Sequence, residues 1–188
     1  MEWILERELI SSKAQSRLIG VFTFLTFMCL GAFVRIPLPF TPVPITLQTF
    51  FVLLSGAFLG TRLGSLTQAA YVFLGLSGLP VFTGAGSGFL YLAGPTGGYI
   101  FGFLVAVLLI GRYIKTAGNN FFSVLVLFFL ADLALLACGA LWLKIIFGYN
   151  LKNAILAGIF PFVPGDLIKA IAATGIYLKL KPRTEQIF

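Results

Sequence analysis

An aspartate and a lysine stand three residues apart near the C-terminus, in a stretch that is otherwise apolar. On a helix, Asp166 and Lys169 share one face, because positions i and i+3 are neighbours there. Charged groups inside a membrane span are expensive, so they usually pair and serve a ligand or an ion. Pro164 and Gly165 come directly before them, and a helix that starts here offers free backbone N–H groups to a polar ligand. The pair predicts a ligand site, with a structural ion pair as the alternative.

Other polar residues in apolar surroundings are weaker candidates. Asp132 lies in the apolar block 121–147, where a structural hydrogen bond to another helix is the favoured interpretation over pairing or capping a polar pocket. Thr41, Thr46 and Gln48 lie in or after a proline-rich loop and can hydrogen-bond a ligand without the penalty of a charge. For Thr46 the alternative is a helix N-cap, because hydroxyl side chains favour that position.

Two glycine clusters frame a long segment in the middle of the chain. Residues 84–88 read Gly-Ala-Gly-Ser-Gly, and residues 94–98 read Gly-Pro-Thr-Gly-Gly. The first cluster lacks the Lys-Ser/Thr of a phosphate-binding loop and does not follow a strand. A loop that approaches a ligand closely is the better interpretation, with a plain outer loop as the alternative. Tyr99 follows the second cluster and offers a ring with a hydroxyl tip.

The remaining residue types argue against catalysis and metal binding. The chain has no His, which removes His-based triads and the commonest metal ligand. Cys29 and Cys138 are far apart in apolar runs, and we interpret them as core residues rather than a disulfide or a metal pair. The chain also lacks an ATP-binding loop, so any motor would have to be a partner. We therefore expect no enzyme activity, no cofactor and no metal.

The composition is that of an integral membrane protein. Hydrophobic residues make up 59% of the 188 residues and charged residues only 10%, against about 25% in a soluble domain. The mean hydropathy is +1.03. The net charge of +7 does not indicate nucleic-acid binding, because the basic residues are scattered between apolar blocks. We interpret them as determinants of membrane topology.

An all-α fold with six transmembrane helices is predicted from the apolar blocks, since about 20 residues cross a bilayer. The blocks cover residues 18–34, 46–60, 63–76, 98–114, 121–147 and 154–178. Gly60-Thr61-Arg62 is a predicted tight turn, and Pro161 and Pro164 break the last span. Residues 75–98 are a predicted long loop or re-entrant segment.

Three segments follow from these spans. Residues 1–17 form an N-terminal cytoplasmic or interfacial segment, either a short interfacial helix or an extension of the first span. Residues 18–178 are the six-helix transmembrane domain, and residues 179–188 are a cytoplasmic tail.

The distribution of basic residues predicts that both termini are cytoplasmic. With six spans, the side of the termini carries Arg7, Lys13, Arg17, Arg62, Arg112, Lys115, Lys179, Lys181 and Arg183. The opposite side carries only Arg35, Lys144 and Lys152. Cytoplasmic loops carry the excess of Lys and Arg. An odd number of spans would place the tail on the other side and abolish this bias.

In its motifs the chain resembles the BioY family, the biotin-specific S components of energy-coupling factor (ECF) transporters. The similar motifs occur in family order over about residues 18–180. They are Ile36-Pro37-Leu38-Pro39, Pro42-Val43-Pro44-Ile45-Thr46-Leu47-Gln48-Thr49, Gly78-Leu79-Pro80-Val81-Phe82, Gly94-Pro95-Thr96-Gly97-Gly98-Tyr99, and Pro161-Phe162-Val163-Pro164-Gly165-Asp166 with Lys169.

The resemblance implies an S-component fold with six helices and cytoplasmic termini, in the cytoplasmic membrane of a prokaryote. It implies high-affinity biotin binding near the outer face and assembly with the coupling protein EcfT and two ABC ATPases. Asp166 would accept a ureido N–H of biotin, and Lys169 would donate to the ureido oxygen or the carboxylate. The implied biotin-binding residues are Asp166, Lys169, Thr46, Gln48, Tyr99, Gly84 and Gly86.

One departure from the family pattern affects docking rather than substrate binding. S components often carry Ala-x-x-x-Ala on helix 1, where small residues let the coupling protein approach. Here residues 22–29 read Phe-Thr-Phe-Leu-Thr-Phe-Met-Cys. An S component for another vitamin and a stand-alone biotin transporter remain the alternatives, and a purely structural subunit would leave Asp166 and Lys169 unexplained.

Overall fold

The computed structural model describes residues 2–184, with side chains described from residue 14 to residue 182. In chain order the elements are α1 (Glu2–Phe33), β1 (Arg35–Ile36), β2 (Ile45–Thr46), α2 (Gln48–Leu76), α3 (Gly88–Leu92), α4 (Gly97–Ala117), α5 (Phe121–Phe147), α6 (Leu151–Gly158) and α7 (Val163–Thr184). The predicted all-α character is confirmed, apart from the two short strands of the first loop.

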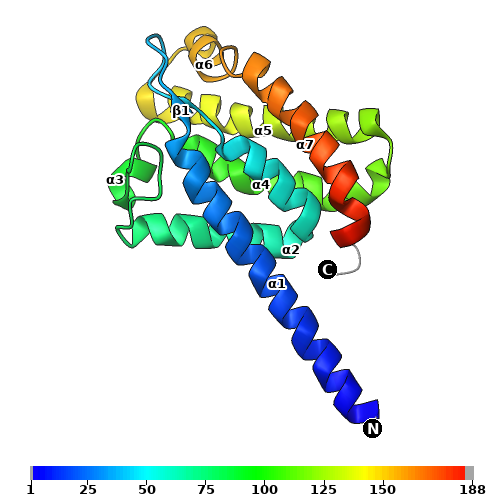
Figure 1. The fold of residues 1–188 in the computed structure, drawn as a ribbon. Coiled ribbons are helices and arrows are strands. Elements are labelled where there is room, and N and C mark those ends of the chain that lie inside the picture. The colour runs from blue at the N-terminus through cyan, green and yellow to red at the C-terminus, as the bar shows by residue number, and fades with distance from the viewer. Residues whose placement is uncertain (1, 185–188) are drawn as a thin grey trace.

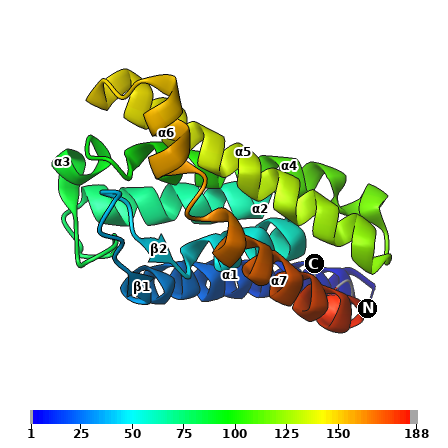
Figure 2. The same ribbon diagram turned by 90° about the horizontal axis from the view of Figure 1, so that it is seen from above.

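The long helices pack side by side, and the connections gather at two opposite ends (Figures 1 and 2). One end holds the β1–β2 hairpin, α3 and the α5–α6 connection. The other end holds the described chain ends and the α4–α5 turn, and α1 extends beyond the rest of the molecule there. Lys181 near the end of α7 donates to Asn119 Oδ1 over 2.6 Å, which fastens that helix to the α4–α5 turn.

Four helices of the described part are long and apolar enough to cross a membrane: Ala14–Phe33 of α1, α2, α4 and α5. The pair α6 and α7 makes a fifth if it is counted as one span bent by 47°. The break predicted at Pro161 and Pro164 therefore exists. α1 is one continuous helix from Glu2, so residues 2–17 extend the first span rather than forming a separate helix.

The difference from six predicted spans lies in α2, which doubles back on itself. Gly60 has φ 69° and ψ −171°, which breaks the helix at the predicted turn. Positive φ suits glycine, because it has no Cβ. The two arms of α2, residues 48–59 and 61–76, then run against each other: Gln68 Nε2 donates to Ser55 Oγ over 3.2 Å. Each arm is shorter than the about 20 residues that a full crossing needs. By length, α2 therefore counts as a single candidate span.

Two loops close the end of the bundle that carries the β-hairpin. β1 and β2 pair antiparallel, with Arg35 opposite Thr46, and this hairpin leads directly into α2. The second loop runs from α2 to α4 and inserts the fully buried ring of Phe82 beside Tyr71 and Tyr91, at centroid distances of 5.4 Å and 5.0 Å. The predicted loop at residues 75–98 is thus an ordered cover, with α3 within it.

Candidate ligand-binding site

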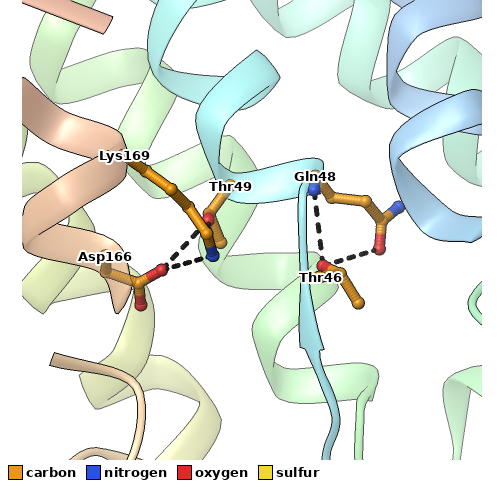
Figure 3. Close-up of polar contacts among 5 residues, drawn as sticks. All are labelled: Thr46, Gln48, Thr49, Asp166 and Lys169. Carbon is orange, nitrogen blue, oxygen red and sulfur yellow. Dashed lines mark hydrogen bonds and ion pairs between the residues drawn. The ribbon is translucent and has the colours of Figure 1, made fainter. Parts of the chain in front are cut away.

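The predicted acid–base pair forms one cluster with a hydroxyl group from α2 (Figure 3). Lys169 Nζ donates to Asp166 Oδ1 over 2.7 Å and to Thr49 Oγ1 over 3.0 Å. Thr49 Oγ1 donates in turn to Asp166 Oδ1 over 3.2 Å. The break between α6 and α7 places the pair in the first turns of α7, where the N–H of Asp166 donates to the carbonyl oxygen of Phe162. The prediction that Asp166 and Lys169 share one helix face is confirmed.

This ion pair is largely removed from water. The side chain of Asp166 is 3% exposed and that of Lys169 is 13% exposed. A carboxylate that loses its hydration needs strong hydrogen bonds in return, and the ammonium of Lys169 is a charge-assisted donor. All contacts within the cluster use Oδ1 of Asp166, so Oδ2 takes no part in it. The cluster can therefore accept a further N–H donor without giving up its own bonds.

A second polar group is centred on Gln48 at the start of α2. Its Nε2 donates to the hydroxyl oxygen of Tyr71 over 2.6 Å, and its Oε1 accepts from Thr83 Oγ1 over 3.1 Å. The hydroxyl of Tyr71 donates onward to the carbonyl oxygen of Val81. Thr46 Oγ1 accepts the N–H of Gln48 over 3.4 Å, as an N-cap residue would, although the N-cap position itself is Leu47 (Figure 3).

Tyr99 contributes its ring rather than its hydroxyl. The hydroxyl donates to the carbonyl oxygen of Gly158 over 2.8 Å, at the end of α6. The ring lies 5.9 Å from that of Phe162, and it packs on Gly139, where a Cβ would meet the ring atoms. Tyr99 therefore forms an aromatic wall and also fixes the position of the α6–α7 break.

A cavity connects these groups. It contains about 500 Å³ of space between atoms, open solvent at its mouth included. Thr46, Gln48, Tyr99, Asp166 and Lys169 line it, so the structure brings five predicted residues together. The apolar walls come from Val43, Ile100, Phe103, Leu135, Leu136 and Phe162.

Gly84 and Gly86 do not line the cavity; they shape the loop that covers it. Gly84 has φ +72° and the guanidinium of Arg35 packs over it. The carbonyl oxygen of Gly86 accepts the N–H of Phe82, and the Tyr91 ring packs on its Cα. The glycine loop was predicted to approach a ligand closely. In the structure, its glycines instead approach the side chains of Arg35 and Tyr91.

Asp132 lies behind the cluster, on α5. It is 1% exposed, and neither carboxylate oxygen receives a hydrogen bond from the described residues. Its strongest electrostatic neighbours are Asp166 and Lys169. The structural hydrogen bond predicted for Asp132 is therefore not found among the described residues, and that prediction is wrong.

Sequence reasoning missed Thr49, Tyr71 and Thr83 as members of the polar lining. Thr49 and Tyr71 lie inside apolar blocks, and Thr83 precedes the glycine cluster. Tyr71 could have been found from its distance to Gln68. The two residues are three positions apart, so on a helix they share one face, and the amide of Gln68 indicates that this face is polar.

Apolar helices that can cross a bilayer, arranged around a cavity with apolar walls and a few polar side chains, define an α-helical membrane protein with a candidate site for a small solute. The model of the BioY family matches residues 7–186, and the chain therefore belongs to the BioY family.

Characterised relatives and a solved structure agree with this membership. The biotin transporter BioY of Thermotoga maritima is 40% identical over 162 residues, which cover 86% of this chain and 92% of that protein. The biotin transporter BioY of Lactococcus lactis is 32% identical over 176 residues, covering 91% and 93%. The crystal structure of an S-component for biotin from an ECF-type ABC transporter superposes with a TM-score of 0.84 at 31% identity, covering 92% of this chain and 93% of that one.

Proposed function

We propose that this protein binds biotin and mediates its uptake across the cytoplasmic membrane, as the substrate-binding subunit of an ECF-type ABC transporter. The observation that carries the proposal is the Asp166–Lys169–Thr49 cluster facing a cavity with apolar walls. Relatives of this chain are named biotin transporters, and the similar solved structure is that of an S-component for biotin.

The chemistry of biotin matches the distribution of polar and apolar groups in the cavity. The fused ring system needs an apolar slot, which the aromatic and aliphatic walls provide. The ureido group carries N–H donors and a carbonyl acceptor. Asp166 accepts a ureido N–H through its unused oxygen, and Lys169 donates to the ureido oxygen or to the carboxylate of the ligand. Gln48 and Thr83 supply neutral hydrogen-bonding groups to the same cavity.

We also infer six membrane-crossing segments with both termini in the cytoplasm. The two arms of α2 count separately in this topology, which the contacts between Ser55 and Gln68 support. The described ends of α1 and α7 and the α4–α5 turn lie at one end of the bundle (Figures 1 and 2), and the segments expected on that side carry the excess of basic residues. The cavity then opens toward the outer face, where the β-hairpin lies.

The proposed partners are the coupling protein EcfT and two ABC ATPases, since the chain has no ATP-binding loop of its own. Phe22 lies in the stretch of α1 where the family pattern has small residues, and it is 60% exposed. Bulky side chains keep helices further apart than alanines do. We therefore propose that α1 meets a coupling protein with a wider helix spacing than the usual motif allows.

The decisive experiment is calorimetric titration of the detergent-purified protein with biotin, and with thiamine and riboflavin as comparison ligands. Tight binding of biotin alone supports the proposal. Tight binding of another vitamin in place of biotin refutes the substrate assignment and identifies an S component of different specificity. Uptake of labelled biotin into cells with and without the ATPase subunits then distinguishes a coupled subunit from a stand-alone transporter.

A further inference from the structure

A basic residue stands at the junction of the two loops that close the cavity. Arg35 on β1 is exposed, and it lies opposite Thr46 in the β1–β2 hairpin. Residues that face each other in an antiparallel pair carry their side chains on the same face of the sheet. Thr46 lines the cavity and contacts Gln48 there, so the side chain of Arg35 emerges on the face of the hairpin that turns toward the cavity.

The guanidinium of Arg35 reaches the covering loop between α2 and α4. It packs over Gly84, where an added Cβ would lie 3.1 Å from Cζ of Arg35. Gly84 directly follows Thr83, which lines the cavity and donates to Gln48. Arg35 is thus flanked by cavity-lining residues on both loops, Thr46 on its own hairpin and Thr83 beside Gly84. This places the guanidinium at the mouth of the cavity.

The charge of Arg35 has no acidic partner among residues 14–182. The acids in that range are Asp132 and Asp166, which are 1% and 2% exposed, and the ion pair found there joins Asp166 to Lys169. A guanidinium presents a planar fork of N–H donors, which fits a carboxylate through two parallel hydrogen bonds. Arg35 is therefore available to bind an anion that reaches the mouth of the cavity.

The interior of the cavity is poorly suited to a second negative charge. Among the residues that line it, the one cation is Lys169, which already pairs with Asp166 at 2.7 Å. An ionised group in apolar surroundings needs a charged partner or strong hydrogen bonds. A ligand carboxylate held beside this pair would also be repelled by the carboxylate of Asp166. The carboxylate of an anionic ligand is therefore more stable at the mouth, in contact with water and Arg35.

We propose that Arg35 binds the carboxylate of the ligand at the mouth of the cavity and thereby selects for a ligand with an anionic tail. This role rests on the proposed function, in which Asp166 accepts a ureido N–H of biotin. The ureido ring and the carboxylate of biotin lie at opposite ends of the molecule, joined by an alkyl chain. With the carboxylate on Arg35, the ureido oxygen is the acceptor for Lys169.

Calorimetric titration of the detergent-purified protein with biotin and with biotinamide tests this role. Biotinamide has the same rings and chain but a neutral end. The wild type is expected to bind biotin about five- to tenfold more tightly than biotinamide. Added salt should weaken the binding of biotin alone, because it screens an exposed ion pair. Equal affinity for the two ligands, or equal salt dependence, overturns the proposal, and this comparison does not depend on how a variant folds.

Substitutions then assign the preference to Arg35. Arg35→Gln should raise the Kd for biotin by about five- to tenfold and leave the Kd for biotinamide within about twofold. Arg35→Lys keeps the charge and should retain the preference for biotin. Lys144→Gln is the matched control, since it removes an exposed charge near the end of α5 and should change neither Kd.

Two results with Arg35→Gln would overturn the proposal. The variant could bind biotin as tightly as the wild type, or it could lose affinity for both ligands equally, in which case Arg35 only holds the covering loop. A wild type that binds neither ligand refutes the proposed function itself. A wild type that binds biotin and biotinamide equally well retains that function and loses the role of Arg35.

Discussion

Replacing Asp166 with Asn isolates the contribution of one negative charge at the ligand site. The variant keeps the shape of the side chain and an oxygen that Lys169 can contact, but it removes the charge. A hydrogen bond to a charged group contributes about 1.5–3 kcal/mol. If the ligand donates an N–H to this carboxylate, the Kd for biotin rises by about 10- to 150-fold. Calorimetric titration measures this ratio directly.

The same substitution also affects the empty protein. Asp166 is buried, and the side chain of its partner Lys169 is 13% exposed. Removing one member of such a pair leaves a buried charge without its partner, which costs about 3–5 kcal/mol. We expect the lower end of that range because the Asn oxygen still accepts. The melting temperature should fall by about 6–12 °C, since each kcal/mol shifts it by about 2–4 °C at this size.

Thr49→Val is the matched control for the role of charge. It removes a neutral hydroxyl from the same cluster, while the 2.7 Å ion pair between Lys169 and Asp166 remains. A neutral hydrogen bond contributes about 1 kcal/mol, so the Kd should rise by less than about tenfold. The reasoning is refuted if Asp166→Asn binds biotin within about twofold of the wild type, or if Thr49→Val loses as much affinity as Asp166→Asn.

Three further substitutions test the packing around the site. Gly64→Val should destabilise the fold by about 1–3 kcal/mol, because a Cβ at Gly64 would lie 2.7 Å from Val107 Cγ1; a lower melting temperature checks this. Gly175→Ala should leave the melting temperature equal or higher, since a Cβ there meets no atom within 4 Å and alanine favours helix; a marked loss would contradict the structure. Tyr99→Phe removes the bond to Gly158 and should cost about 1 kcal/mol of stability with only a small change in Kd, because the ring remains; a large loss of affinity would mean that the hydroxyl binds the ligand.

Local signals in the sequence predicted most of the helix boundaries. α5 begins and ends where predicted, because Asn120 caps its start by accepting from the N–H groups of Phe122 and Ser123, and Gly148 ends it in the left-handed region. The turn at Gly60 and the break before α7 also follow from glycine and proline chemistry, which acts within a few residues. These features depend on neighbours in sequence, so a single chain reveals them.

The assembly of the site depends on contacts that no local pattern contains. Thr49 reaches Asp166 across 117 positions, and Gln48 reaches Thr83 across 35. The sequence supplied the candidates Asp166, Lys169 and Gln48 through their polarity in apolar surroundings. Thr49 and Thr83 look like ordinary neutral residues until α2 folds back and the covering loop is in place.

The interior of the α2 hairpin has a consequence for how the protein enters the membrane. Ser55, Thr67 and Gln68 are buried between helices, and Gln68 is bonded to Ser55 on the other arm. Ser55 and Thr67 also bond to carbonyl oxygens of their own arm, but an arm inserted alone would present the amide of Gln68 to lipid without its partner Ser55. The insertion machinery therefore has to release the two arms into the bilayer together, after the chain has been synthesised beyond Leu76.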